Sequence, residues 1–172
     1  RGILILVITM YYYLNYFFLF SIFGHFIEGF FYSDGDSGIL NGYWTPIYGL
    51  GVIVIIIFYN AIKPFIENAK FKKFLSVFMI GAVSLSFLEY VGGIIIETLF
   101  HIVFWNYSSM RFNIGKYTSL EMAFIWGIAS VILIYLIKPL VDKFIKKIPK
   151  LITWILLILL SVDLISMIFK IK

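Results

Sequence analysis

Five long apolar stretches dominate this sequence and restrict what the chain can fold into. A helix needs about 20 mostly apolar residues to cross the roughly 30 Å hydrocarbon core of a bilayer. Stretches of this kind cover residues 3–32, 46–62, 74–104, 120–137 and 151–169. With 62% hydrophobic and only 13% charged residues, a soluble fold could not bury so much apolar surface. We therefore predict an all-α, polytopic membrane helix bundle of about five transmembrane helices, with short and partly ordered outer loops.

Lysine and arginine are distributed unevenly between the segments that connect these stretches. Segments 63–73 and 138–150 are rich in lysine, whereas segment 33–45 has no cation. The positive-inside rule then places the amino end in the cytoplasm and the carboxyl end outside. We assign the basic segments to orientation and to contact with anionic membrane lipid, and predict no nucleic-acid partner. No linker divides the chain, so residues 1–172 are predicted to form one integral membrane domain, and a homo-oligomer is left open.

Carboxylates inside the apolar stretches are the main functional candidates, because burying an ionisable side chain in a bilayer costs about 2.5 kcal/mol or more. Glu28, Glu89 and Glu97 lie within such stretches, and Glu121 lies at the start of the fourth. The predicted orientation puts all four in the outer half of the membrane or near its middle. We therefore predict an outward-facing polar pocket lined by these carboxylates. The sequence leaves open whether they bind a solute, relay protons or only tie helices together.

Other residues could complete this pocket. Aromatic and turn residues after the first and third stretches predict ordered loops that line or cap it, with Tyr48, Trp105, Asn106 and Tyr107 as the candidates. Several glycines in the first and third stretches are expected to bring these two spans together: Gly24, Gly29, Gly81, Gly92 and Gly93.

Two histidines are weak candidates for metal ligands. His25 lies three residues before Glu28 and His101 four residues after Glu97, so each pair shares one helix face. Such pairs can hold a divalent cation, but they also occur easily by chance. The chain has no cysteine, and neither a metal nor another cofactor is expected.

The candidate residues fall into short motifs that occur in a fixed order. They are Gly24-x-x-x-Glu28, Leu40-x-Gly42-x-x-x-Pro46-Ile47-Tyr48-Gly49, Leu88-Glu89-Tyr90, Glu97-x-x-Phe100, Trp105-Asn106-Tyr107-Ser108, Asn113-x-Gly115-Lys116 and Trp126-Gly127. Over about residues 13–140 this series resembles the bacterial family called Putative ABC-transporter type IV, the CmpB-like permeases. The chain departs from the family pattern at His25, at Asn106, where Asp is usual, and at Lys116, where Arg is usual. The departures at Asn106 and Lys116 argue against a charge pair at those positions.

The resemblance implies a permease-like transport component in the bacterial cytoplasmic membrane, without specifying its substrate. The sequence contains no ATP-binding motif GxxxxGK[ST], so a separate ATPase or another membrane subunit would have to drive transport. An intramembrane enzyme acting on a lipid or an isoprenoid-linked substrate is the alternative, although neither G-x-S-x-G nor HExxH is present. A third hypothesis is an accessory or assembly protein whose polar residues only pack helices.

Overall fold

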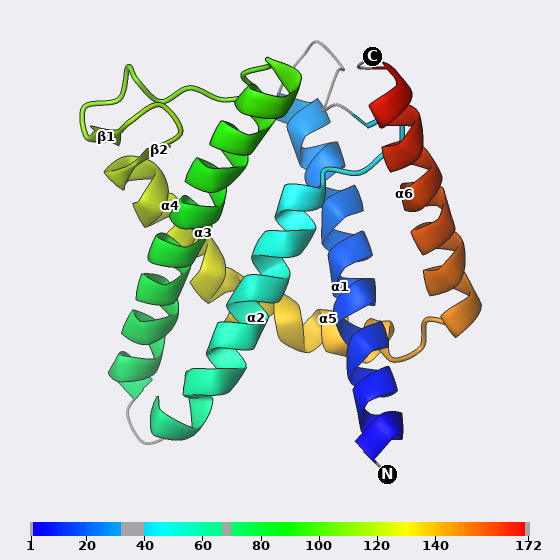
Figure 1. The fold of residues 1–172 in the computed structure, drawn as a ribbon. Coiled ribbons are helices and arrows are strands. Elements are labelled where there is room, and N and C mark those ends of the chain that lie inside the picture. Colours follow the sequence, from blue (N-terminus) through cyan, green and yellow to red (C-terminus); the bar gives the residue numbers. More distant parts are fainter. Residues whose placement is uncertain (1, 32–39, 67–69, 171–172) are drawn as a thin grey trace. The chain divides into compact units, whose positions relative to one another are not determined.

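A computed structural model of the chain describes residues 2–31, 40–66 and 70–170 (Figure 1). In this part of the chain five helical segments are long and apolar enough to cross a membrane, which confirms the prediction of an all-α membrane bundle. The elements are α1 (Gly2–Phe31), α2 (Pro46–Ile66), α3 (Lys70–Phe100), β1 (Asn113–Ile114), β2 (Thr118–Ser119), α4 (Leu120–Ile132), the π-helix η1 (Leu133–Ile137), α5 (Lys138–Ile145) and α6 (Lys150–Lys170).

The chain divides into two compact units. Unit 1 comprises Arg1–Ile53 and Val141–Lys172, and unit 2 comprises Val54–Leu140. The helix α2 begins in unit 1 and ends in unit 2. The single domain expected from the sequence stays a prediction.

The third span ends earlier than the sequence suggested. The apolar run continues to Phe104, but α3 stops at Phe100. His101 follows with a φ of 56°, and its backbone N–H donates to the carbonyl of Glu97 at 2.9 Å. A residue in this left-handed conformation is a common helix terminator, and His adopts it more readily than apolar residues do.

The fourth span continues beyond the expected end at Lys138-Pro139. Helical structure persists through α5 to Ile145, because the π-helix η1 ends at Ile137, two residues before Pro139. The backbone N–H of Lys138 donates to the carbonyl of Leu133, five residues back. This wider turn accommodates Pro139, which lacks an N–H and would clash with the preceding turn of a regular α-helix. The second span also extends, to Ile66 through Pro64.

Unit 1 is built on α1. Small residues let α1 and the first turns of α2 approach each other closely. Gly24 of α1 faces the ring of Tyr48, and Gly49 of α2 faces Ser21 and the carbonyl of Phe17. The helix α6 lies beside α1 (Figure 1). A buried hydrogen bond of 2.7 Å joins them, from the Thr153 hydroxyl of α6 to the side-chain oxygen of Asn15 of α1.

Glycine at position 49 is therefore expected to be essential for packing in unit 1. We expect Gly49→Ala to lower the free energy of unfolding by about 1–3 kcal/mol, because the added methyl would overlap the backbone of α1. The matched control is Gly29→Ala in α1, where a Cβ would meet nothing within 4 Å. That change should be neutral, or stabilising by about 0.5–1 kcal/mol. Thermal unfolding in detergent measures both, and equal effects would contradict the prediction.

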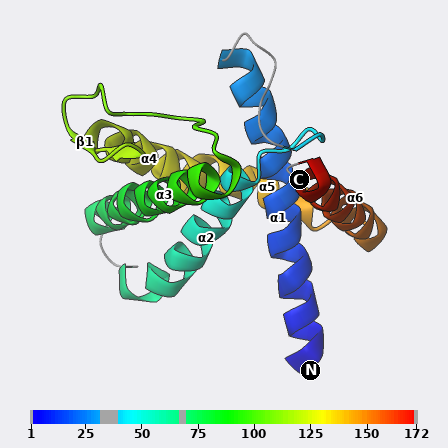
Figure 2. The ribbon, with the colours of Figure 1, turned by 45° about the horizontal axis from the view of Figure 1, so that its top comes forward.

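Unit 2 is built on the pair of helices α3 and α4, which lie side by side in both views (Figures 1 and 2). Gly81 of α3 faces Ser130 of α4, Gly127 of α4 faces Phe78, and Gly93 of α3 faces Tyr117. The expectation that glycines join the first span to the third is therefore wrong at Gly24, Gly81 and Gly93. Their Cβ positions are occupied by other partners.

Candidate functional site

The most deeply placed candidate carboxylate, Glu89, lies in unit 2 on the face of α3 that meets α4. It is only 6% exposed. Two donors from different segments share its carboxylate: the Tyr107 hydroxyl at 2.8 Å and the Trp126 indole N–H at 3.1 Å. A buried carboxylate is tolerated when it is hydrogen-bonded in this way. Glu89 therefore joins α3, α4 and the connecting segment 101–119.

Two turns further along α3, Glu97 forms the ion pair of the site. One carboxylate oxygen accepts from the Lys116 ammonium and the other from the Tyr117 hydroxyl. The Glu97 and Lys116 side chains remain 41% and 33% exposed, so both stay accessible. The hydrogen bond to Glu97 raises the pKa of Lys116, which keeps that side chain charged at neutral pH.

Segment 101–119 is an ordered loop closed by a small hairpin. The strands β1 and β2 pair antiparallel, with Asn113 opposite Ser119, and the loop lies over the ends of α3 and α4 (Figure 2). Gly115 supplies a φ of 67° at the turn, a conformation that glycine adopts without strain. The ordered loop that the sequence predicts here is therefore present.

The three loop candidates contribute differently. Trp105 donates its indole N–H to the carbonyl of Tyr117 at 3.2 Å, and Tyr107 reaches Glu89. Asn106 accepts the backbone N–H of Ser108 at 2.9 Å, which shapes a turn. Of the three, only Tyr107 bonds a carboxylate, Trp105 contacts Tyr117, and Asn106 is exposed and acts locally.

Glu121 fixes the base of the same loop. It accepts the backbone N–H of Phe112 at 3.1 Å and lies in the first turn of α4, where a negative charge stabilises the helix. Ser119 caps this helix by accepting the N–H of Met122. Glu89, Glu97 and Glu121 thus all contact segment 101–119.

Glu28 lies in unit 1. Its carboxylate accepts from the Thr45 hydroxyl at 3.2 Å and is hydrogen-bonded by Tyr48. Two of the predicted pocket residues, Glu28 of α1 and Tyr48 of α2, are therefore brought together in unit 1. A pocket that combines Glu28 with Glu97 of unit 2 stays a prediction.

Two acidic residues of unit 1 were missed in the sequence. Asp163 of α6 is 7% exposed and accepts four hydrogen bonds of 2.8–3.0 Å, from the N–H and side chain of Asn41, the N–H of Gly42 and the indole of Trp44. Asp142 of α5 accepts the hydroxyls of Tyr12 and Tyr16, each at 2.8 Å. Asp163 carries the same signal as Glu89, a lone acid in an apolar stretch. Asp142 lies in segment 138–150, which the sequence predicts to connect two spans, so it does not stand out as an acid within an apolar stretch.

One family of proteins matches most of this chain. The family described as Putative ABC-transporter type IV matches residues 15–170. The chain belongs to this family. No curated protein and no solved structure matches it.

The family match extends to residue 170, beyond the end of the resemblance at about residue 140, and so includes α6 with Asp163. The family is described as of an ABC-transporter type, and together with the five apolar helices it indicates an integral membrane protein. The family usually has Arg at position 116, and the sequence therefore argued against a charge pair at Lys116. That expectation is wrong, because Lys116 pairs with Glu97.

The two histidines have other surroundings. His25 packs edge-on against Tyr43, with ring centroids 5.4 Å apart, and His101 is exposed at the end of α3. In the part of the chain that the structure describes, no group of three or more His, Cys, Asp or Glu could hold a metal ion. A hollow that the structure does contain is apolar and lies between α3 and α4, and none of the four predicted carboxylates is among the residues that line it.

Proposed function

We propose that this chain is the membrane-embedded permease component of a bacterial ABC-type transporter. In this proposal the amino end is cytoplasmic, and segment 101–119 faces outward in the cytoplasmic membrane. The permease role is supported by the family, which is of an ABC-transporter type. The orientation is supported by the lysines of segments 63–73 and 138–150, which lie at the ends of the spans opposite segment 101–119.

The half-exposed ion pair of Glu97 and Lys116 is the observation that carries a solute-binding role. Both partners are accessible at the end of a span, so a charged solute could replace one of them in the pair. Separating Glu97 from Lys116 for this purpose costs little free energy, because an exposed ion pair contributes little to stability. Glu89, Tyr107 and Trp105 would then form the polar floor of the site, as part of an outward-facing pocket.

Energy would come from a separate ATPase, because this sequence has no phosphate-binding loop of the P-loop type. The exposed lysines near the end of α5 offer a docking surface on the cytoplasmic side. Lys146 and Lys147 follow α5 directly and are exposed, and they would contact acidic side chains on the ATPase. Charge complementarity of this kind steers association and sets specificity.

The proposal can be tested by capture of the partner from native membranes. We expect the tagged full chain, cross-linked in its own host cells, to retain an ATPase with a P-loop. The double change Lys146→Glu and Lys147→Glu should abolish this capture by reversing the docking charge. Mass spectrometry of the purified complexes identifies the partner.

The matched control for this experiment is Arg111→Glu, a charge reversal at an exposed cation of segment 101–119. It should leave capture unchanged, since that segment is proposed to face outward. Absence of any P-loop ATPase from the wild-type complex would overturn the proposal. Loss of capture in both variants would show that the orientation is wrong.

The accessory role remains the second candidate, because each of the four predicted carboxylates already has a partner within its own unit. The variant Glu97→Gln distinguishes the accessory role from the proposed permease function. Under an accessory role it lowers thermal stability without changing transport, whereas under the proposed function the fold persists and transport is lost. The alternative of an intramembrane enzyme requires that the purified protein alter a lipid extract, as seen by mass spectrometry.

A further inference from the structure

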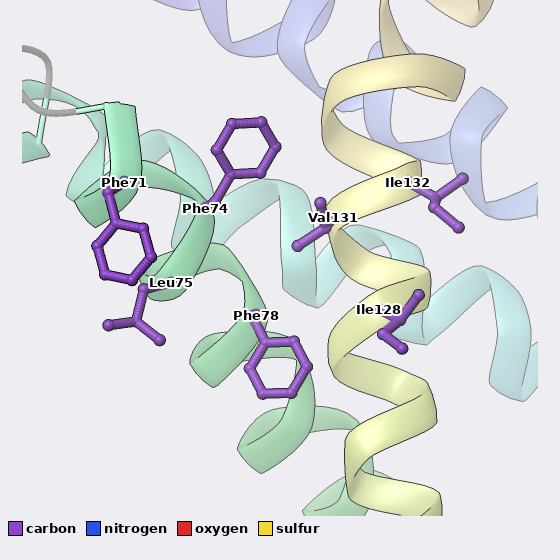
Figure 3. A pocket seen from close by; sticks show the side chains of 7 residues that line it. All are labelled: Phe71, Phe74, Leu75, Phe78, Ile128, Val131 and Ile132. Carbon is purple, nitrogen blue, oxygen red and sulfur yellow. The ribbon is translucent and has the colours of Figure 1, made fainter.

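An open apolar groove runs between α3 and α4 within unit 2. Its volume is about 320 Å³, and only hydrophobic side chains line it, four from Phe71 to Phe78 on α3 and three from Ile128 to Ile132 on α4. In Figure 3, Phe74 and Phe78 of α3 and Val131 of α4 lie between the two helices, whereas Phe71 and Leu75 point away from α4 in this view. Several of these side chains are widely exposed, Phe71 at 79%. The groove therefore opens sideways, toward the acyl chains of a surrounding bilayer.

Positive charge lies at one end of this groove. Lys72 is exposed and Lys73 half-buried, and both belong to the first turn of α3, next to Phe71 and Phe74. Because α3 begins at Lys70, the unpaired N–H groups of its first turn lie at the same level. An occupant with an apolar chain and an anionic head would match the groove and its basic end together.

A buried hydroxyl, that of Tyr135, lies beside the basic end of the groove. Tyr135 belongs to the π-helix that begins directly after Ile132, and its ring lies 4.6 Å from that of Phe74. The Tyr135 hydroxyl is buried and has no hydrogen-bond partner among the described residues. Buried hydroxyls are normally paired, so an unpaired one calls for an acceptor. Phe74, whose ring contacts that of Tyr135, is one of the residues that line the groove and is half exposed.

We propose that this groove is a specific site for an anionic phospholipid. One acyl chain lies between α3 and α4, and the phosphate contacts Lys72 and Lys73. An ester or phosphate oxygen supplies the acceptor that the Tyr135 hydroxyl lacks. Basic sites between transmembrane helices on the cytoplasmic side are suited to anionic headgroups, and the predicted orientation puts this end of α3 on that side. The site is distinct from the carboxylates of the proposed transport function and does not depend on it.

Native mass spectrometry of the full chain tests the site. The purified protein is incubated with an equal mixture of phosphatidylglycerol and phosphatidylcholine, and the lipids that stay bound are counted. We expect one molecule of phosphatidylglycerol to be retained in preference to phosphatidylcholine. The changes Lys72→Gln and Lys73→Gln should each reduce that preference roughly five-fold, while Lys63→Gln, at the end of α2, should not.

A groove-filling variant tests the acyl-chain contact separately. Leu75→Trp should abolish retention by occupying the groove, whereas Val83→Trp should not. Val83 lies on the same helix and is also lipid-exposed, at 64%, but does not line the groove. Equal retention of the two lipids by the wild-type chain would overturn the proposal without any variant. Undiminished retention by Leu75→Trp would overturn it as well.

Discussion

Replacing Asp163 with alanine is expected to lower the free energy of unfolding by about 3 kcal/mol. Its carboxylate is the shared acceptor for two backbone N–H groups, an amide and an indole. The change would leave the buried Trp44 indole and the backbone at Asn41 and Gly42 without this acceptor, and each such loss costs about 1–3 kcal/mol when water cannot substitute. Denaturant unfolding in detergent micelles measures the effect.

The same change should release the segment that precedes α2. Residues 40–45 are joined to α6 through Asp163, so hydrogen exchange at Gly42 and Trp44 should accelerate strongly in the variant. Ser161→Ala is the control, because the Ser161 hydroxyl donates to the Leu157 carbonyl of its own helix. It should change stability by less than about 0.5 kcal/mol. Comparable losses in both variants would show that Asp163 has no special role.

Glu89→Leu is expected to cost about 2 kcal/mol, for a related reason in unit 2. The leucine removes the acceptor shared by the Tyr107 hydroxyl and the Trp126 indole. Removing one partner of a buried hydrogen bond costs more than removing both. The triple change Glu89→Leu, Tyr107→Phe and Trp126→Phe should therefore recover most of the loss.

Thermal unfolding and hydrogen exchange of segment 101–119 measure this second prediction. The single variant should unfold at a lower temperature and expose the loop, and the triple variant should approach the wild type. If the triple variant is the least stable of the three, the hydrogen bonds of Glu89 are not the reason for the loss. If the Glu89→Leu protein is as stable as the wild type, the free-energy cost of burying the carboxylate is as large as the stabilisation from its hydrogen bonds.

Much of the site could be found from sequence because acids are so costly inside apolar stretches. Glu28, Glu89 and Glu97 stand out for that reason, and the structure gives each of them hydrogen-bond donors. The donors could be assigned only in part. Tyr48 and Tyr107 were among the expected pocket residues, but nothing local showed which carboxylate each would reach, and nothing distinguished Thr45 from other polar residues near the membrane surface.

The apolar stretches by themselves determined the number and type of the spans, because a bilayer allows little besides helices of sufficient length. They did not determine where the helices end. His101 and Pro139 act through backbone geometry, which hydropathy does not register. Only the tertiary structure decided the partners, because a hydrogen bond between Asp163 and Trp44, more than a hundred residues apart, depends on which helices pack together. It also revealed the apolar groove beside Lys72, which exists only where α3 and α4 leave space between them.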